Sequence, residues 1–332
     1  MSRSVMQEIL RHETLSVQTR MTTLGFATAL LVIAASAGLS AQRTPRTSNG
    51  RRDLQGIWLN NTATPLERLK DFADRAFFTE AEAREFEKHY LLDRAAAVNI
   101  DNPFELEVGA DVDVMEPGHV LRNRRTSSII DPPDGRIPAL TPEARQRSID
   151  QAQHLKAHYA ENPEDLRSGE RCLMIAGSPV GPPMLPVYYN NNIQIVQTEH
   201  YVMILAEMIH DARVISLDRR AHLPANIRQW KGDSIGHWEG DTLLVDTTNF
   251  TDKTTFRGSG SELHVVERFT LSDIDTLTYK FTIDDPSAFV RTWSAESAMS
   301  RSEAPMFEYA CHEANYSMTN VLKGARYGEG VR

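Results

Sequence analysis

The stretch from Asn226 to Ile283 most constrains what this chain can fold into, because its side chains alternate between two faces in successive short runs. The runs 242–248, 263–271 and 276–283 read as strands, and Gly-Asp, Glu-Gly-Asp and Ser-Asp sequences between such runs are typical of tight turns. Further strands are predicted over 193–198, 201–206, 213–217 and 291–299. Strands at this spacing predict an antiparallel meander that curls or closes into a barrel.

Two helices interrupt the β pattern. The first is predicted over 79–97, since Thr79 is a candidate N-cap with Glu82 three residues later. The second is predicted over 142–160, where Thr141 is followed by a proline at the first helical position. The expected fold is therefore mainly β, a lipocalin-like or related curled barrel with two accessory helices.

The N-terminus predicts export. An uncharged apolar run, Leu24–Gly38, ends in Leu-Ser-Ala, which is typical of a signal peptide and is too short to span a bilayer. We expect residues 1–41 to be a signal peptide, with 1–20 a possible over-extended start, and 42–52 to be a flexible leader. Residues 53–332 then form a single β-rich domain in the periplasm or outside the cell, with no membrane anchor after cleavage.

The net charge indicates which classes of partner to expect, and the cysteines indicate a disulfide. A net charge of -9 without a basic stripe argues against nucleic-acid partners. The chain has two cysteines, Cys172 and Cys311, and an even pair in an exported protein predicts a disulfide. The rival interpretation, a nucleophilic Cys311 beside His312, is disfavoured because neighbours on an extended strand point to opposite faces.

Longer motifs resemble a known group of proteins. The segments 207–213, 226–230, 236–243 and 309–313 are similar to a family of exported proteins abundant in Acidobacteria and related soil bacteria, usually described only as hypothetical. The resemblance covers most of the chain from about Asp53 and implies no catalytic residue. The Gly/Pro-rich loop after Cys172 departs from that family's usual Arg-Gly-Leu-Pro pattern. Separately, Gly56-x-Trp58 resembles the opening strand of lipocalin-type barrels, where the tryptophan plugs one end.

Candidate acid/base residues lie on the predicted strands. If 201–217 were one unbroken strand, Glu207, Asp211 and Arg213 would share a face with Tyr201, where they form either a ligand site or a structural ion pair. His237 and Trp238 precede a Glu-Gly-Asp turn, which places them at a barrel mouth or leaves the histidine in solvent.

The later strands add an enzyme-like pairing. Glu267 shares a face with Phe269, and Tyr279 and Trp293 fall on the next strands, so an inward glutamate beside a tyrosine is expected. His154 and His158 recur at helical spacing, but the glutamate of the zinc-protease motif is missing, and we expect these histidines in solvent and no metal site.

These residues leave three functions open. The first is binding of a small, partly apolar molecule inside the barrel, with Tyr201, Arg213, Trp238, Tyr279 and Trp293 as candidate contacts. The second is a cofactor-independent isomerase, dehydratase or hydrolase in the same cavity, with Glu207, Asp211, His237, Glu267 and His312 as candidate catalytic groups. The third is a surface or assembly role without a cavity. No motif for a cofactor is present, and the oligomeric state is not indicated.

Overall fold

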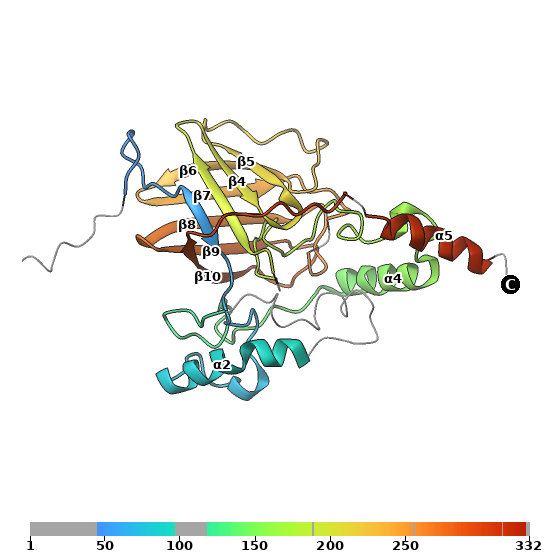
Figure 1. Ribbon diagram of the computed structural model, residues 1–332, viewed down its shortest axis with the longest axis horizontal. Coiled ribbons are helices and arrows are strands. Elements are labelled where there is room, and N and C mark those ends of the chain that lie inside the picture. Colours follow the sequence, from blue (N-terminus) through green and yellow to red (C-terminus); the bar gives the residue numbers. More distant parts are fainter. Residues whose placement is uncertain (1–44, 97–117, 188, 255, 314, 330–332) are drawn as a thin grey trace, which may run out of the picture. The chain divides into compact units, whose positions relative to one another are not determined.

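The computed structural model describes residues 45–96, 118–187, 189–254, 256–313 and 315–329 (Figure 1). The predicted signal peptide, 1–41, lies outside these residues. No helix in the described ranges is long and apolar enough to cross a membrane.

The core of the fold is a closed, mostly antiparallel barrel of nine strands. The barrel strands are β1 (Gly56–Leu59), β3 (Asn192–Gln197), β4 (Tyr201–Ala206), β5 (Ala212–Ser216), β6 (Asp233–Glu239), β7 (Thr242–Thr248), β8 (His264–Asp273), β9 (Thr276–Asp284) and β10 (Trp293–Ser302). Each pairs with the next in that order, and β1 pairs with β10 to close the ring. The predicted barrel is therefore confirmed as closed.

Two features depart from a simple meander. β5 and β6 pair in parallel through Ser216 and Ile235, so residues 217–232 cross from one end of the barrel to the other. The extra strand β2 (Ile129–Asp131) pairs with the beginning of β10, whereas β1 pairs with its end. β1 and β2 thus lie one after the other along the same edge of β10.

The described part of the chain contains three α-helices, where two were expected. They are α2 (Glu80–Ala96), α4 (Pro142–His158) and α5 (Ser317–Glu329). Thr79 and Glu82 form the expected capping box, with Thr79 N–H donating to Glu82 at 2.8 Å and Glu82 N–H donating to Thr79 Oγ1 at 3.2 Å. Thr141 caps α4 by accepting from the Ala144 N–H.

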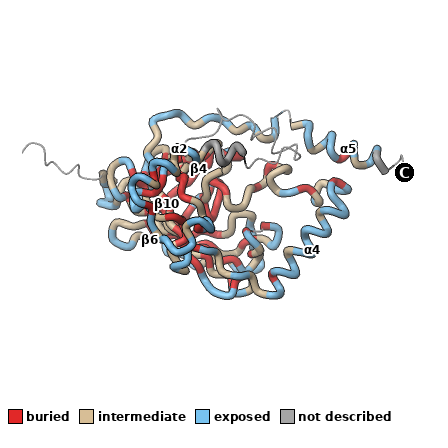
Figure 2. The backbone as a smooth tube through the Cα atoms, turned by 90° about the horizontal axis from the view of Figure 1, so that it is seen from below, coloured by how far each residue is buried: buried red, intermediate tan, exposed pale blue. Residues whose placement is uncertain are grey.

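The helix that was not predicted, α5, packs on the chain that follows α4. Leu322 of α5 is buried with Ala160 and Leu166, and Met318 and Ala325 pack against them. The described residues also contain three short 3-10 turns, at Lys70–Phe72, Pro163–Asp165 and Met208–His210. Figure 2 shows that buried residues gather in the strands, while α4 and α5 are mostly exposed.

Residues 45–52, within the leader expected to be flexible, make contacts instead. Arg46 and Arg52 form an isolated antiparallel bridge, and both guanidinium groups pair with Asp241 in the β6–β7 turn. The Gln197 side chain also donates to the Arg52 carbonyl. The charged turn at Asp241 holds this segment against the barrel.

The separate strands predicted over 201–206 and 213–217 are confirmed as β4 and β5, but the shared face assumed for an unbroken strand over 201–217 is wrong. The chain turns back at Met208–His210, so β4 and β5 form a hairpin in which Ile204 faces Arg213. Because facing residues of an antiparallel pair share a side of the sheet, Arg213 points inward with the buried Ile204, while Tyr201 lies on the outer face and is about half exposed. The turn therefore separates Arg213 from the face on which the alternation placed it.

Candidate functional site

A buried ion pair lies inside the barrel. Arg213 on β5 and Glu267 on β8 form a two-pronged salt bridge, with Nη2 of the arginine 2.9 Å from Oε1 of the glutamate and Nη1 bonded to Oε2. The side chain of Arg213 is 5% exposed and that of Glu267 is 0% exposed. Removing two charges from water is costly, and this geometry offsets the cost because each carboxylate oxygen receives an N–H.

Tyr279 on β9 extends this pair into a network. Its hydroxyl donates to Glu267 Oε1 at 2.8 Å and accepts the backbone N–H of Met184 at 2.9 Å. Arg213 Nη2 lies 3.9 Å from the Met184 sulfur. Met184 belongs to the loop between α4 and β3, so that loop enters the barrel and contacts Tyr279 and Arg213. We call Arg213, Glu267 and Tyr279 the inner cluster.

Burial and the neighbouring carboxylate shift the pKa values of Arg213 and Tyr279. Burial lowers the pKa of Arg213, but the charge of Glu267 and its hydrogen bonds outweigh this effect and raise it above its ordinary value. Burial, together with the charge of Glu267, raises the pKa of Tyr279 well above its ordinary value. The arginine is charged and the tyrosine neutral throughout the physiological range.

Aromatic rings form a continuous wall beside the inner cluster. Tyr279 packs against Phe269 and Phe281 with ring centroids 5.1 and 5.7 Å away, and Phe281 meets Trp293 edge-on at 5.7 Å. These four rings are 0 or 1% exposed. They come from inward positions of β8, β9 and β10, which the strand register sets side by side.

Three polar atoms in this interior lack a hydrogen-bond partner among the described residues. They are Arg213 Nε, Trp293 Nε1 and Ser297 Oγ. Ser297 faces Tyr279 across β9 and β10, and all three residues are 5% exposed or less. Because most buried polar groups in proteins are hydrogen-bonded, three unpartnered ones on the inner wall of one barrel call for an explanation.

The structure brings together four of the predicted site residues: Arg213, Glu267, Tyr279 and Trp293. Trp238 is also on the inner face of its strand, since it pairs with the buried Leu243, and it is partly buried against the core. Tyr201 is the exception among the candidate ligand contacts, because it points outward.

Among the described residues, the remaining candidate catalytic groups make no hydrogen bond or salt bridge to the inner cluster, although Lys231, the partner of Asp211, interacts electrostatically with Arg213. Asp211 pairs with Lys231 at 2.6 Å. His237 is on the outer face of β6, exposed, beside Glu239. His312 is exposed in the segment after β10. Glu207 is buried at the turn after β4, where its carboxylate accepts from Asn192 and from the Phe307 N–H.

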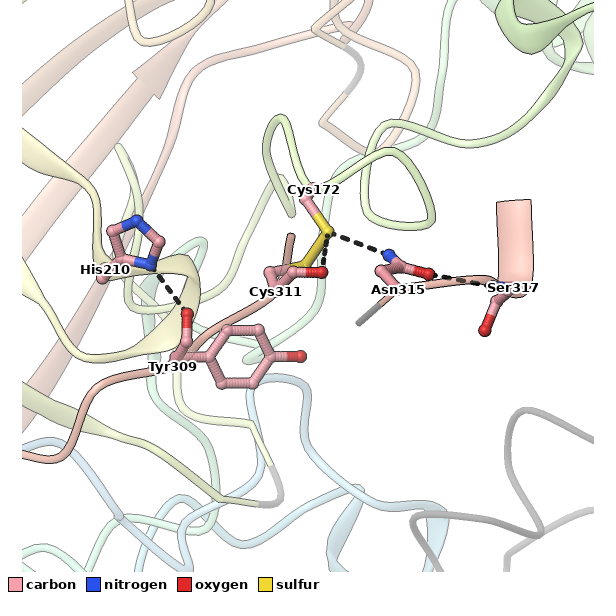
Figure 3. Close-up of a disulfide and its surroundings, with 6 residues drawn as sticks. All are labelled: Cys172, His210, Tyr309, Cys311, Asn315 and Ser317. Atoms are coloured by element: carbon pink, nitrogen blue, oxygen red, sulfur yellow. Dashed lines mark hydrogen bonds between the residues drawn. A yellow bond between two sulfur atoms is a disulfide. The ribbon is translucent and has the colours of Figure 1, made fainter. Parts of the chain in front are cut away.

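The predicted Cys172–Cys311 disulfide is confirmed, with a Cα–Cα distance of 5.8 Å. It attaches the segment after β10 to the start of the loop that carries Met184 (Figure 3). Nearby, the His210 ring nitrogen donates to the Tyr309 carbonyl at 2.7 Å, and Asn315 donates to the Cys172 sulfur. A nucleophilic role for Cys311 is excluded because its sulfur is bonded.

A second group of ionisable residues, which sequence reasoning missed, lies on the outer face of the barrel. His222 lies between two carboxylates, with Nδ1 3.0 Å from Asp233 and Nε2 2.9 Å from Asp246. His264 contacts the other oxygen of Asp246 at 3.0 Å. We call these four residues the outer cluster. The strand register sets Asp246 and His264 near each other on β7 and β8, but His222 comes from the 217–232 crossover, which no periodicity reveals.

No group of histidine, cysteine, aspartate or glutamate in the described ranges is arranged to hold a metal ion. His154 and His158 have acidic neighbours, Asp165 and Glu161, and both histidines are exposed. Comparison with family models, curated proteins and solved structures gives no match. The contacts of the chain's own residues are therefore the basis for a functional proposal.

Proposed function

We propose that the barrel binds a small, partly apolar molecule at the inner cluster, in the space that the Met184 side chain occupies. The observation that carries the proposal is the set of unpartnered polar atoms, Arg213 Nε, Trp293 Nε1 and Ser297 Oγ, beside an aromatic wall. An apolar wall with a few convergent polar groups is the usual composition of a small-molecule site.

Met184 is the side chain that a ligand would displace. It comes from a loop without regular structure, whereas the other contacts of the inner cluster come from strands fixed by their ladders. Its backbone makes one hydrogen bond to Tyr279, and its carbonyl accepts a longer one, 3.4 Å, from Asn60. The Met184 side chain is an unbranched thioether whose sulfur, a weak acceptor, lies beside Arg213. A flexible apolar ligand with one acceptor atom could make the same contacts.

The acid/base alternative has less support. An enzyme of that kind needs a group that is free to exchange a proton with the substrate. Asp211 and His237 are engaged with Lys231 and Glu239, and His312 is exposed. Glu267 itself is held by Arg213 and Tyr279. Binding is thus the function that the described geometry favours.

The test is a fluorescence titration with N-phenyl-1-naphthylamine, an uncharged apolar probe. We expect saturable binding to the wild type and at least fivefold tighter binding to Met184→Ala, because that substitution removes the displaced side chain. Met174→Ala is the matched control: Met174 is equally buried, at 1% exposed, on the same connection, and makes no hydrogen bond through its side chain to the inner cluster. An equal gain in Met174→Ala, or no saturable binding to either the wild type or Met184→Ala, would refute the proposal.

We also propose that the protein is exported to the periplasm or the medium. The apolar run 24–38 and the disulfide between Cys172 and Cys311 support this proposal, since disulfides persist in oxidising compartments. N-terminal sequencing of the protein recovered from the periplasm or medium should begin at or near Gln42. Recovery of intact residues 24–38 in the membrane fraction would contradict it.

A further inference from the structure

The unpartnered polar atoms of Arg213, Trp293 and Ser297, on the inward positions of β5 and β10, can all donate. Arginine and tryptophan side chains carry N–H donors and no acceptor, so Arg213 Nε and Trp293 Nε1 each offer a donor, and the Ser297 hydroxyl can donate as well. The Met184 sulfur, which lies beside Arg213 Nη2, is a weak acceptor. The interior therefore presents donors, and the atom that fills the position next to Arg213 accepts.

The inner cluster carries no net charge that could pair with a charged ligand. Arg213 and Glu267 neutralise each other, and Tyr279 is kept neutral by burial and by the nearby carboxylate. A third charge in this place would be buried without a counter-ion, which is strongly unfavourable.

The other charged side chains around the inner cluster have partners of their own. Lys231, whose charge acts on Arg213, is paired with Asp211 at 2.6 Å. Arg301 on β10 donates to the carbonyls of Ile274 and Gln55, and its guanidinium lies 4.3 Å from the centroid of the Trp58 ring. Asp285 follows Tyr279 by six residues, roughly 20 Å along the chain, and accepts from Ser287. A charged ligand head beside Arg213 would therefore compete with these existing contacts for a counter-ion.

We infer that the barrel selects an uncharged molecule with an apolar body and a hydrogen-bond acceptor, such as a ketone, ester or ether oxygen, which takes the place of the Met184 sulfur beside Arg213. The inference rests on the binding site proposed above and specifies its ligand class. Aromatic rings of Phe281 and Trp293 contact the apolar body, and the donors of the inner wall orient the oxygen.

The experiment measures displacement of N-phenyl-1-naphthylamine from the wild-type protein by four probes of equal chain length: 2-decanone, decanoate, decylammonium and 1-decene. We expect 2-decanone to bind at least tenfold more tightly than either ion and at least fivefold more tightly than 1-decene. The alkene is the more hydrophobic of the two neutral probes, so a preference for the ketone reports its oxygen.

The double variant Arg213→Met with Glu267→Leu supplies the control for the donor. It removes the ion pair without leaving a lone charge, a change that buried pairs often tolerate, and circular dichroism checks its fold. In this variant 2-decanone should lose its preference over 1-decene while both still bind. An ion or 1-decene that binds the wild type as tightly as 2-decanone would overturn the ligand class and leave the binding site standing. Failure of all four probes to displace the bound dye would overturn the ligand class alone, and absence of saturable dye binding would overturn both.

Discussion

Arg213 constrains the interior of the barrel more than it adds to the free energy of unfolding. Its salt bridge with Glu267 is almost fully buried, and such pairs contribute little because desolvation offsets the attraction. Breaking the pair is different, because the remaining partner is left charged in an apolar interior. The pair therefore constrains the interior even where it adds little free energy of unfolding.

Replacing Arg213 alone by methionine should lower the free energy of unfolding by about 3 to 5 kcal/mol, since Glu267 would stay buried without a cation. The double variant Arg213→Met with Glu267→Leu should lie within about 1.5 kcal/mol of the wild type. Urea denaturation followed by fluorescence measures both. The exposed pair of Arg84 and Glu80 is the control, and Arg84→Met should change stability by less than about 0.5 kcal/mol. A double variant as unstable as the single one would contradict the explanation.

Sequence reasoning predicted part of the inner cluster because period-two alternation is a local property. Glu267 and Tyr279 follow from it, as does the inward Trp293. Met184 could not be predicted, because it lies in a Gly/Pro-rich loop whose path into the barrel depends on tertiary contacts. Ser297 was overlooked because a serine alone on a strand carries no chemical signal.

At the scale of single elements, the turn Met208–His210 explains the main error in the predicted site. Ile209 has φ of 62°, a backbone conformation that β-branched residues rarely adopt. No glycine, asparagine or proline marks the turn, so an unbroken strand was the natural prediction. Burial of Ile209 and of Glu207, which accepts the Phe307 N–H, stabilises the turn against this strain.

Two glycines at the ends of β6 give a matched test of turn geometry. Gly232 and Gly240 both have positive φ, of 69° and 61°, but an added Cβ would lie 2.5 Å from the Thr248 carbonyl at Gly232 and would meet nothing within 4 Å at Gly240. Gly240→Ala should therefore lower the free energy of unfolding by about 1 kcal/mol, the cost of holding alanine at a positive φ. Gly232→Ala should cost at least about 2 kcal/mol more, since backbone must shift. Thermal denaturation distinguishes the two, and equal costs would contradict the steric explanation.

The outer cluster predicts how stability depends on pH. Burial raises the pKa of Asp233, but hydrogen bonds from Arg220, the Leu223 N–H and His222 outweigh it and hold that pKa at about 2. The stability from this carboxylate is present above its unfolded pKa and is lost as pH falls toward 2. The hydrogen bond to Asp246 raises the pKa of His264. The stability from this histidine is present below its unfolded pKa, about 6.5, and is lost as pH rises.

We therefore expect the free energy of unfolding to fall between pH 6 and pH 8, by on the order of 0.5 to 1 kcal/mol for a partly exposed pair. His264→Gln should remove most of this decline. His237→Gln, on the exposed outer face of β6, should leave it unchanged. Guanidinium denaturation at several pH values measures the effect, and an unchanged slope in His264→Gln would disprove the assignment.

At the scale of the whole molecule, the architecture was more predictable than the connections. Alternation and turn residues gave the barrel, and capping residues gave α2 and α4. The parallel pairing of β5 and β6, the insertion of β2 and the helix α5 depend on contacts between distant segments. Leu322 of α5, for example, packs on Leu166, and the local sequence around either residue does not indicate this contact.

The disulfide has a whole-molecule effect because its cysteines are 139 residues apart. A crosslink over so long a loop restricts the unfolded chain, and we expect the double variant Cys172→Ser with Cys311→Ser to lose roughly 4 to 5 kcal/mol of unfolding free energy. Denaturation without reductant gives the difference. Wild type treated with reductant should match the double variant, and a loss below about 1 kcal/mol would show that the crosslink constrains little.

The pairing of β1 with β10 has a consequence for how the protein is made. The strand nearest the start of the described chain finds its partner in the last strand, Ile57 beside Ser302, so the contact order of the closing step is high. Folds dominated by such distant pairings form slowly. During synthesis the edge of β1 that faces away from β3 therefore stays unpaired until β10 has emerged, and an open edge of this kind pairs readily with other chains. Nascent copies of this protein should depend on holding chaperones until β10 is available.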